Sequence, residues 1–133
     1  MQNQVLIVED HEHLAVALAV LLNGDPRFQV CGVAHDIPDA IATNAPGTRA
    51  DLVIVDINLP GGSGLDLIRV LRAVNPAARY LVFSQQDPAV FGPLARGAGA
   101  AGYLRKGAPP EAILEVAAAI ASGGEYFPGI REG

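Results

Sequence analysis

The chain has 133 residues, of which 50% are hydrophobic and 5% aromatic, so it is long enough for one compact domain with a hydrophobic core. Nine basic against fourteen acidic residues give a formal net charge of −5, which repels phosphate backbones and argues against direct nucleic-acid binding by this chain. The single cysteine excludes an internal disulfide, and no apolar stretch reaches the ~20 residues of a membrane span. A strand is expected within four residues of the start, which leaves no room for a signal peptide, so we expect a soluble cytoplasmic domain.

The first half of the chain alternates short apolar runs with helical periodicity. Residues 4–8 read as a buried strand that ends in Glu9-Asp10. A helix is expected over residues 11–22, followed by a second strand over 28–33 and a weaker alanine-rich helix over about 38–44. The inner face of the first helix carries Leu14, Leu18, Leu21 and Leu22. We expect Cys31, on the second strand, to be a small buried hydrophobe.

The stretch DLVIVDINLPGGSG, residues 51–64, holds the third predicted strand. Its unbroken apolar run over 52–55 is typical of a strand buried on both faces, and it delivers Asp56 into a Pro-Gly-Gly turn. Gly64 then begins a helix with one apolar face, and a fourth strand over 79–83 ends at Ser84. The apolar face of that helix carries Leu67, Ile68, Leu71 and Val74.

The last third begins with Asp87-Pro88, a helix cap followed by a first-turn proline. Gly92 and Pro93 lie inside this helix, so we expect it to be kinked or shortened between residues 88 and 98 and close to local unfolding. A short fifth strand over 102–104 is closed by Lys106. The last helix opens at 109 or 110, and one of its faces carries Ile113, Val116, Ala117 and Ile120.

Five strands alternating with five helices predict an α/β fold whose parallel sheet is covered on both faces. Right-handed crossovers and a single reversal of direction favour the doubly wound, flavodoxin-like strand order 2-1-3-4-5. The switch point between the first and third strands then brings Glu9, Asp10 and Asp56 together at the carboxyl edge of the sheet. Ser84 and Lys106 follow the fourth and fifth strands at the same edge.

Three neighbouring carboxylates repel one another, because each pair at ~4 Å costs on the order of 4 kcal/mol at an effective dielectric of 20. The cluster therefore predicts a bound cation, and Mg²⁺ suits it as a hard ion that takes one or two carboxylates together with water and phosphate oxygens. A carboxylate nucleophile, a divalent cation, a lysine and a hydroxyl together are typical of a phosphoryl-transfer site.

These residues resemble the receiver domains of bacterial two-component response regulators. The resemblance rests on the acidic pair Glu9-Asp10, the D-x-N-x-P-G stretch at residues 56–61, Gly64, Ser84, and the stretch GYLRKG around Lys106. The spacings also agree, with 46 residues from Asp10 to Asp56, 28 more to Ser84, 19 to Tyr103 and three to Lys106. The resemblance covers residues 4 to about 124, and GYLRKG with the later IASGGEYF is most similar to the LuxR-type subfamily.

The resemblance implies a phosphoacceptor and a metal site. Asp56 would take a phosphoryl group from a histidine kinase. Asp10 and Asp56 would bind Mg²⁺ directly, Asn58 would offer its backbone carbonyl, and Glu9 would lie close by or act through water.

It also implies a switch. Lys106 would pair with the acyl phosphate, Ser84 would donate to a phosphoryl oxygen, and Tyr103 would swing inward as Ser84 moves. The fourth helix, fifth strand and fifth helix would then present an altered face to an output domain or to a second receiver. Gln85, in a position that is usually small, would tune the lifetime of the phosphoaspartate.

The implied domain division is a receiver over residues 1–124 and a tail over 125–133, the latter being the start of a linker or an appended end. The helix-turn-helix domain of the LuxR-type subfamily, which would control transcription, needs further chain.

The main alternative is a phosphatase or phosphotransferase of the haloacid-dehalogenase type, which also forms an aspartyl phosphate. Such enzymes resemble a D-x-D pattern whose second aspartate protonates the leaving group, whereas Asn58 stands here. No cap domain is present either. A flavodoxin-like nucleotide carrier is a third possibility, but a phosphate-cradling loop after the first strand is absent. We therefore expect a signalling switch rather than an enzyme.

Overall fold

A computed structural model describes residues 2–43 and 50–128 of the chain. Its main sheet is five-stranded and parallel, with the order β2-β1-β3-β6-β7, so the predicted doubly wound topology is confirmed. The strands are β1 (Asn3–Val8), β2 (Phe28–Ala34), β3 (Leu52–Val55), β6 (Arg79–Ser84) and β7 (Gly102–Arg105). The helices of the described part are α1 (Glu12–Asn23), α2 (Ile37–Thr43), α3 (Gly64–Val74), α4 (Pro88–Ala98) and α5 (Pro110–Ala121).

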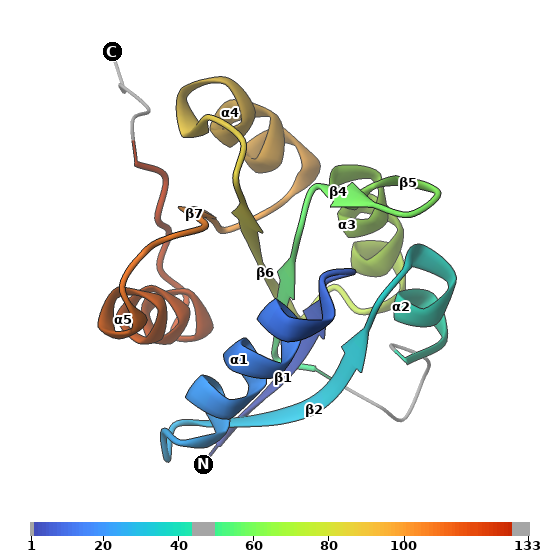
Figure 1. The fold of residues 1–133 in the computed structure, drawn as a ribbon. Helices are drawn as coiled ribbons and strands as arrows, with labels where there is room; N and C mark the ends of the chain where they lie inside the picture. Colours follow the sequence, from blue (N-terminus) through green and yellow to red (C-terminus); the bar gives the residue numbers. More distant parts are fainter. Residues whose placement is uncertain (1, 44–49, 129–133) are drawn as a thin grey trace.

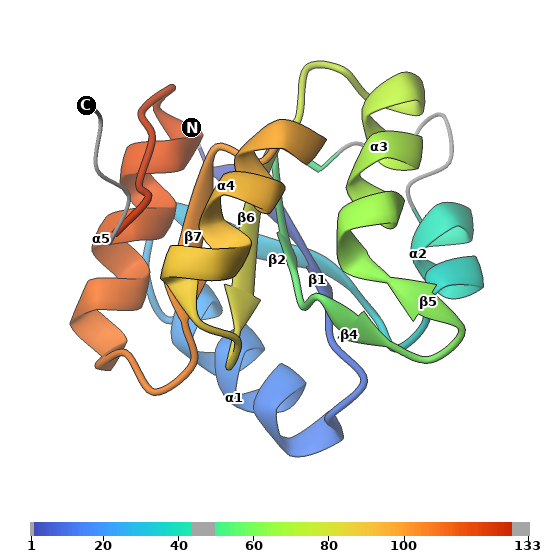
Figure 2. The same ribbon diagram turned by 90° about the horizontal axis from the view of Figure 1, so that it is seen from above.

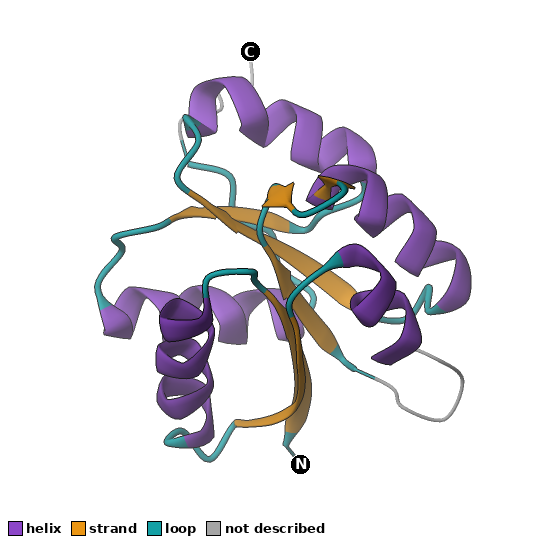
Figure 3. Cartoon of the chain, turned by 45° about the vertical axis from the view of Figure 1, so that its right-hand side comes forward, coloured by secondary structure: helices purple, strands orange, loops and turns teal. Residues whose placement is uncertain are grey.

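Helices cover both faces of the sheet (Figure 3). One face packs against α2, α3 and α4, and the other packs against α1 and α5 (Figures 1 and 2). Alternate residues of β1 serve the two cores: Leu6 and Val8 face the first, while Val5 and Ile7 face the second. Because β1 and β3 are buried on both faces, the polar residues after them emerge only at the carboxyl edge of the sheet.

A small antiparallel hairpin follows β3 and was not expected from the sequence. It pairs β4 (Asn58–Leu59) with β5 (Gly62–Ser63), and Gly61 occupies its turn with φ +87°. Each strand has only two residues, too few for a recognisable alternation of apolar and polar side chains. The hairpin fixes the backbone of Asn58 beside Asp56.

Cys31 is exposed, so its predicted burial is wrong. The reason is its place on β2, which lies at the edge of the sheet and is only partly covered. Val74 is also exposed, at 52%, whereas Leu67, Ile68 and Leu71 are buried as predicted. At about 100° per residue, Val74 lies only about 20° from the buried Leu67, so its exposure comes from its place as the last residue of α3 rather than from the helix face.

The apolar faces of the first and last helices are predicted with unequal success. In α1, Leu18 and Leu22 are buried together with Ala15, while Leu14 and Leu21 are partly buried. All four predicted inner residues of α5 are buried, namely Ile113, Val116, Ala117 and Ile120. The exposed N-terminal end of α1 lies close to the polar edge of the sheet, which explains the partial exposure of Leu14.

The sequence predicts a kinked or shortened α4. The helix is not shortened, because it runs from Pro88 to Ala98 through Pro93, while the kink and the local unfolding stay predictions. Asp87 caps its start, where its side chain accepts a hydrogen bond from the Ala89 N–H at 3.0 Å. At its end, Gly99 takes the left-handed conformation and Arg72 donates to the Ala98 carbonyl oxygen at 3.4 Å. The caps and the buried face of small residues offset the loss of one backbone donor at proline.

Candidate functional site

A cavity of about 630 Å³ lies at the carboxyl edge of the sheet, where β1, β3 and β6 end. Open α/β sheets bind ligands at this edge, next to the point where the strand order reverses. The polar residues lining the cavity include Glu9, Asp10, Asp56, Asn58, Gln85 and Lys106. The sequence had assigned all six to one site, and the fold brings them together from four separate segments.

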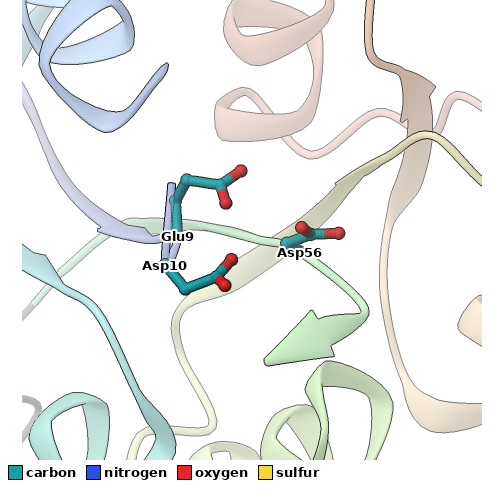
Figure 4. A group of neighbouring side chains, drawn as sticks. All are labelled: Glu9, Asp10 and Asp56. Carbon is teal, nitrogen blue, oxygen red and sulfur yellow. The ribbon is translucent and has the colours of Figure 1, made fainter. Parts of the chain in front are cut away.

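Three carboxylates converge in this cavity. One oxygen from each of Glu9, Asp10 and Asp56 lies within 4.8 Å of the others (Figure 4). Glu9 and Asp56 are buried, at 2% and 7% exposure, whereas Asp10 is exposed. Hard oxygen donors at this separation fit a divalent cation such as Mg²⁺.

Lys106 joins two of the carboxylates. Its Nζ lies 2.7 Å from Glu9 Oε1 and 2.8 Å from Asp56 Oδ2. Burial alone would lower the pKa of Lys106, but its hydrogen bonds to Asp56 and Glu9 raise that pKa above the usual value, so the ammonium stays charged. Three carboxylates with one ammonium leave a formal charge of −2 in the cluster, which a single divalent cation balances.

Both oxygens of Glu9 are already engaged. Oε1 contacts Lys106, and Oε2 accepts a hydrogen bond from the His11 N–H at 3.1 Å. Burial raises the pKa of Glu9 above its usual value, while these two partners act to lower it. The carboxylate of Asp10 is therefore more open to a metal ion than that of Glu9.

The backbone around Asp56 is held from two sides. Its N–H donates to the Val8 carbonyl oxygen at 3.1 Å, which ties the end of β3 to β1. Gly64, at the start of α3, packs against Asp56 so closely that a Cβ built there would collide with the Asp56 carbonyl oxygen. The sequence marked Gly64 only as a helix start, and its second role depends on a contact that spacing cannot reveal.

Ser84 and Tyr103 are buried and are not among the residues that line the cavity. Ser84 is fully buried, and its Oγ accepts a hydrogen bond from the Gln86 N–H at 3.2 Å. Tyr103 is also fully buried, and its hydroxyl donates to the Gln86 carbonyl oxygen at 2.7 Å. Burial raises the pKa of Tyr103, which keeps this donor protonated. In this arrangement the aromatic ring already lies inside, against the loop that joins β6 to α4.

His11 and Leu14 also line the cavity, although the sequence did not assign them to it. His11 caps α1, where its Nδ1 accepts a hydrogen bond from the Leu14 N–H at 3.3 Å. Their position directly after the Glu9-Asp10 pair was the available signal, because the first turn of the next helix must lie at the same edge of the sheet.

Residues 5–118 match the family model described as the response regulator receiver domain. The chain is 36% identical over 126 residues to the nitrate/nitrite response regulator protein NarP of Escherichia coli K12, covering 93% of this chain and 57% of NarP. It is 35% identical over 105 residues to the DNA-binding transcriptional activator DevR/DosR of Mycobacterium tuberculosis, covering 77% of this chain and 47% of that relative.

The chain is also similar to a solved structure. A two-component response regulator of the LuxR family from Aurantimonas superposes with a TM-score of 0.88 at 29% identity, covering 96% of this chain and 91% of that one. The chain spans about half the length of the curated relatives named above. No helix in the described residues is long and apolar enough to cross a membrane.

Proposed function

Because the chain belongs to the response regulator receiver domain family, we propose that it is a phosphorylation-dependent switch in which Asp56 accepts a phosphoryl group from a histidine kinase. The observation that carries this proposal is the position of Asp56. Its buried carboxylate lines the cavity, with an oxygen within 4.8 Å of an Asp10 oxygen and with Oδ2 at 2.8 Å from Lys106 Nζ.

Mg²⁺ is the cofactor that the donor set suits. Asp10 and Asp56 would hold it through carboxylate oxygens, Asn58 through its backbone carbonyl and Glu9 through water. When bound, the ion neutralises charge on the phosphoryl oxygens during transfer.

The chain's own residues supply the nucleophile and its orientation. Lys106 donates to Asp56 Oδ2 and would hold the carboxylate in a fixed orientation for attack on the phosphorus atom. An O–P bond forms at Asp56 as the N–P bond of the kinase phosphohistidine breaks, and the released imidazole takes up a proton. Lys106 then pairs with the acyl phosphate, and Ser84 donates its hydroxyl to a phosphoryl oxygen.

The response would pass from Ser84 to the loop at Gln86 and from there to Tyr103 and α4. Since Tyr103 is already buried, phosphorylation would stabilise or tighten this inward arrangement. The output face would be α4, β7 and α5, on which Val90 and Leu94 of α4 are exposed at 56% and 52%. An output domain or a second receiver would dock there.

The control of transcription would lie in a DNA-binding domain outside these residues, as the name of the DNA-binding transcriptional activator DevR/DosR suggests. This chain, with its net charge of −5, would not bind nucleic acid itself. We propose residues 1–124 as the receiver and 125–133 as the start of a linker. Residues 129–133 lie outside the described part of the chain.

Phosphoryl labelling tests the proposal. With acetyl phosphate and Mg²⁺, the wild type should incorporate one phosphoryl group, and Asp56→Asn or excess EDTA should abolish incorporation. Asp66→Asn is the matched control, because Asp66 is an exposed carboxylate on α3 paired only to Arg69 among the described residues. Undiminished labelling of Asp56→Asn would overturn the assignment, and steady turnover of phosphate monoesters would favour an enzyme instead.

A further inference from the structure

The segment that leaves α5 does not run into solvent but returns along the edge of the sheet. Residues 124–127, here called the tail segment, pass beside β7 toward α4 (Figure 1). The Tyr103 N–H donates to the Tyr126 carbonyl oxygen at 2.8 Å, and the Tyr126 N–H donates to the Ala101 carbonyl oxygen at 3.0 Å. The tail segment therefore covers part of the edge of β7 through a single parallel β-bridge between Gly102 and Tyr126.

Two arginines hold the tail segment from different elements. Arg79, the first residue of β6, donates from Nη2 to the Gly124 carbonyl oxygen at 3.0 Å. Arg96, in the last turn of α4, lies 3.3 Å from Glu125, and its guanidinium lies 4.9 Å from the ring centre of Phe127. Phe127 in turn packs against the core on the α3 and α4 side of the sheet. We call these two arginines the tail clamp.

The two parts of the tail clamp differ in how firmly they are anchored. Arg79 belongs to a strand paired on both sides, with β3 and with β7, so it cannot move without the sheet. Arg96 belongs to a surface helix, and its ion pair with Glu125 is half-exposed, at 38% and 55% for the two side chains. Exposed contacts of this kind are individually weak, so a small shift of α4 can break them.

Tyr103 directly connects the loop that joins β6 to α4 with the tail segment. Its hydroxyl donates to the Gln86 carbonyl oxygen, two residues after Ser84, and its backbone N–H donates to the carbonyl oxygen of Tyr126. The loop at Gln86 also leads into the Asp87 cap of α4. A displacement of that loop therefore reaches the tail segment by two routes, through β7 and through α4.

We propose that the tail segment is held by this clamp in the unphosphorylated chain, and that phosphorylation of Asp56 loosens the Arg96 part through α4. Phe127 is then freed from its packing against the core. The inference rests on the proposed function, since it needs α4 to respond to the site. It assigns to Arg96, Glu125 and Phe127 a role in passing the signal out of the domain.

Hydrogen exchange by NMR tests the proposal on the full chain with Mg²⁺, with and without beryllofluoride. The Tyr126 amide should exchange faster once beryllofluoride is bound. Arg96→Gln should speed its exchange about fivefold without beryllofluoride, the size expected for losing one exposed ion pair and one cation–π contact. In the Arg96→Gln variant, beryllofluoride should raise the exchange rate of the Tyr126 amide only slightly further. Glu125→Gln should also speed exchange of the Tyr126 amide. This second variant tests the proposal even if Arg96→Gln fails to fold.

Arg69→Gln is the control, since it removes an exposed ion pair from α3, with Asp66, and should leave Tyr126 unchanged. The α4 amides could respond to beryllofluoride while the Tyr126 amide does not respond or becomes more protected. That result would contradict the tail clamp but leave the proposed switch intact. If Arg96→Gln and Glu125→Gln both leave Tyr126 exchange at the wild-type rate, the clamp is likewise overturned. If no amide of α4 responds, the proposed function fails, and the two variants still decide whether the clamp exists.

Discussion

At the residue scale, Lys106 explains how the chain can fold around three carboxylates. Its ammonium lies between Glu9 and Asp56, so part of the repulsion is offset by the protein itself. Asp10 makes neither of these contacts and is exposed to the cavity. The three carboxylates are therefore unequal, although the sequence presents two of them as an adjacent pair.

This inequality predicts different metal affinities for two variants. Asp10→Ala should weaken Mg²⁺ binding about tenfold or more, because it removes a direct ligand. Glu9→Ala should weaken it much less, since both oxygens of Glu9 are engaged by Lys106 and the His11 N–H. Calorimetric titration with Mg²⁺ measures both. Equal losses would mean that the two roles are assigned wrongly.

The burial of Tyr80 predicts that the stability of the protein depends on pH. It is 1% exposed, its hydroxyl donates to the Asn75 carbonyl oxygen at 3.1 Å, and burial raises its pKa to about 12. In the unfolded chain the pKa is about 10. Because the folded state holds the proton more tightly, this stabilisation is complete below pH ~10 and is lost as the pH rises toward 12.

The measurement compares the wild type with Tyr80→Phe in urea. The advantage of the wild type in unfolding free energy should shrink by on the order of 2 kcal/mol between pH 9 and pH ~12, because phenylalanine does not titrate. An advantage that stays constant across that range would show that the Tyr80 hydroxyl does not titrate on unfolding.

At the element scale, α4 has capped ends but an unfavourable proline in its interior. Asp87 and Gly99 cap it, yet Pro93 leaves the Ala89 carbonyl oxygen without its intrahelical donor. The side chain of Pro93 is exposed, so its ring adds little packing to compensate. An element held by its caps and its buried small residues is suited to shift as a unit.

Pro93→Ala should therefore stabilise the protein, by about 1–3 kcal/mol, since interior proline is about 3 kcal/mol less favourable than alanine in a helix. Pro88→Ala is the matched control and should be near neutral, because proline is well tolerated in the first turn. Urea denaturation gives both values. A destabilised Pro93→Ala variant would show that the proline ring makes a contact that the helix needs.

At the scale of the whole molecule, the site lies at the carboxyl edge of the parallel sheet, and the proposed output face lies on one flank. Hydrogen exchange with and without beryllofluoride should change around residues 87–104, which follow Ser84 and include α4 and Tyr103. The amides of α2 (Ile37–Thr43), on the other flank of the sheet, should not change. A uniform response of both segments, or none in residues 87–104, would contradict a directed switch.

Periodicity and turn chemistry were sufficient to predict the five strands of the main sheet, the helices and their order, but not the small hairpin of β4 and β5. The buried runs before Asp56 and Ser84, and the Asp87-Pro88 cap, are local signals that the fold keeps. Strand ends in a parallel sheet meet at one edge, so the shared location of Asp10, Asp56 and Lys106 followed from the topology alone. These features depend only on neighbours in the chain and on the rules of parallel sheets.

Other features exist only once distant segments touch. The exposure of Cys31 depends on which strand lies at the edge, and the contact of Gly64 with the Asp56 carbonyl depends on how α3 meets β3. The double engagement of Glu9, the inward position of Tyr103 and the return of the tail segment to β7 are likewise tertiary contacts. The sequence by itself determined which groups stand at the site, and only the tertiary structure decided which of them are already paired, because pairing depends on distances across the fold rather than along the chain.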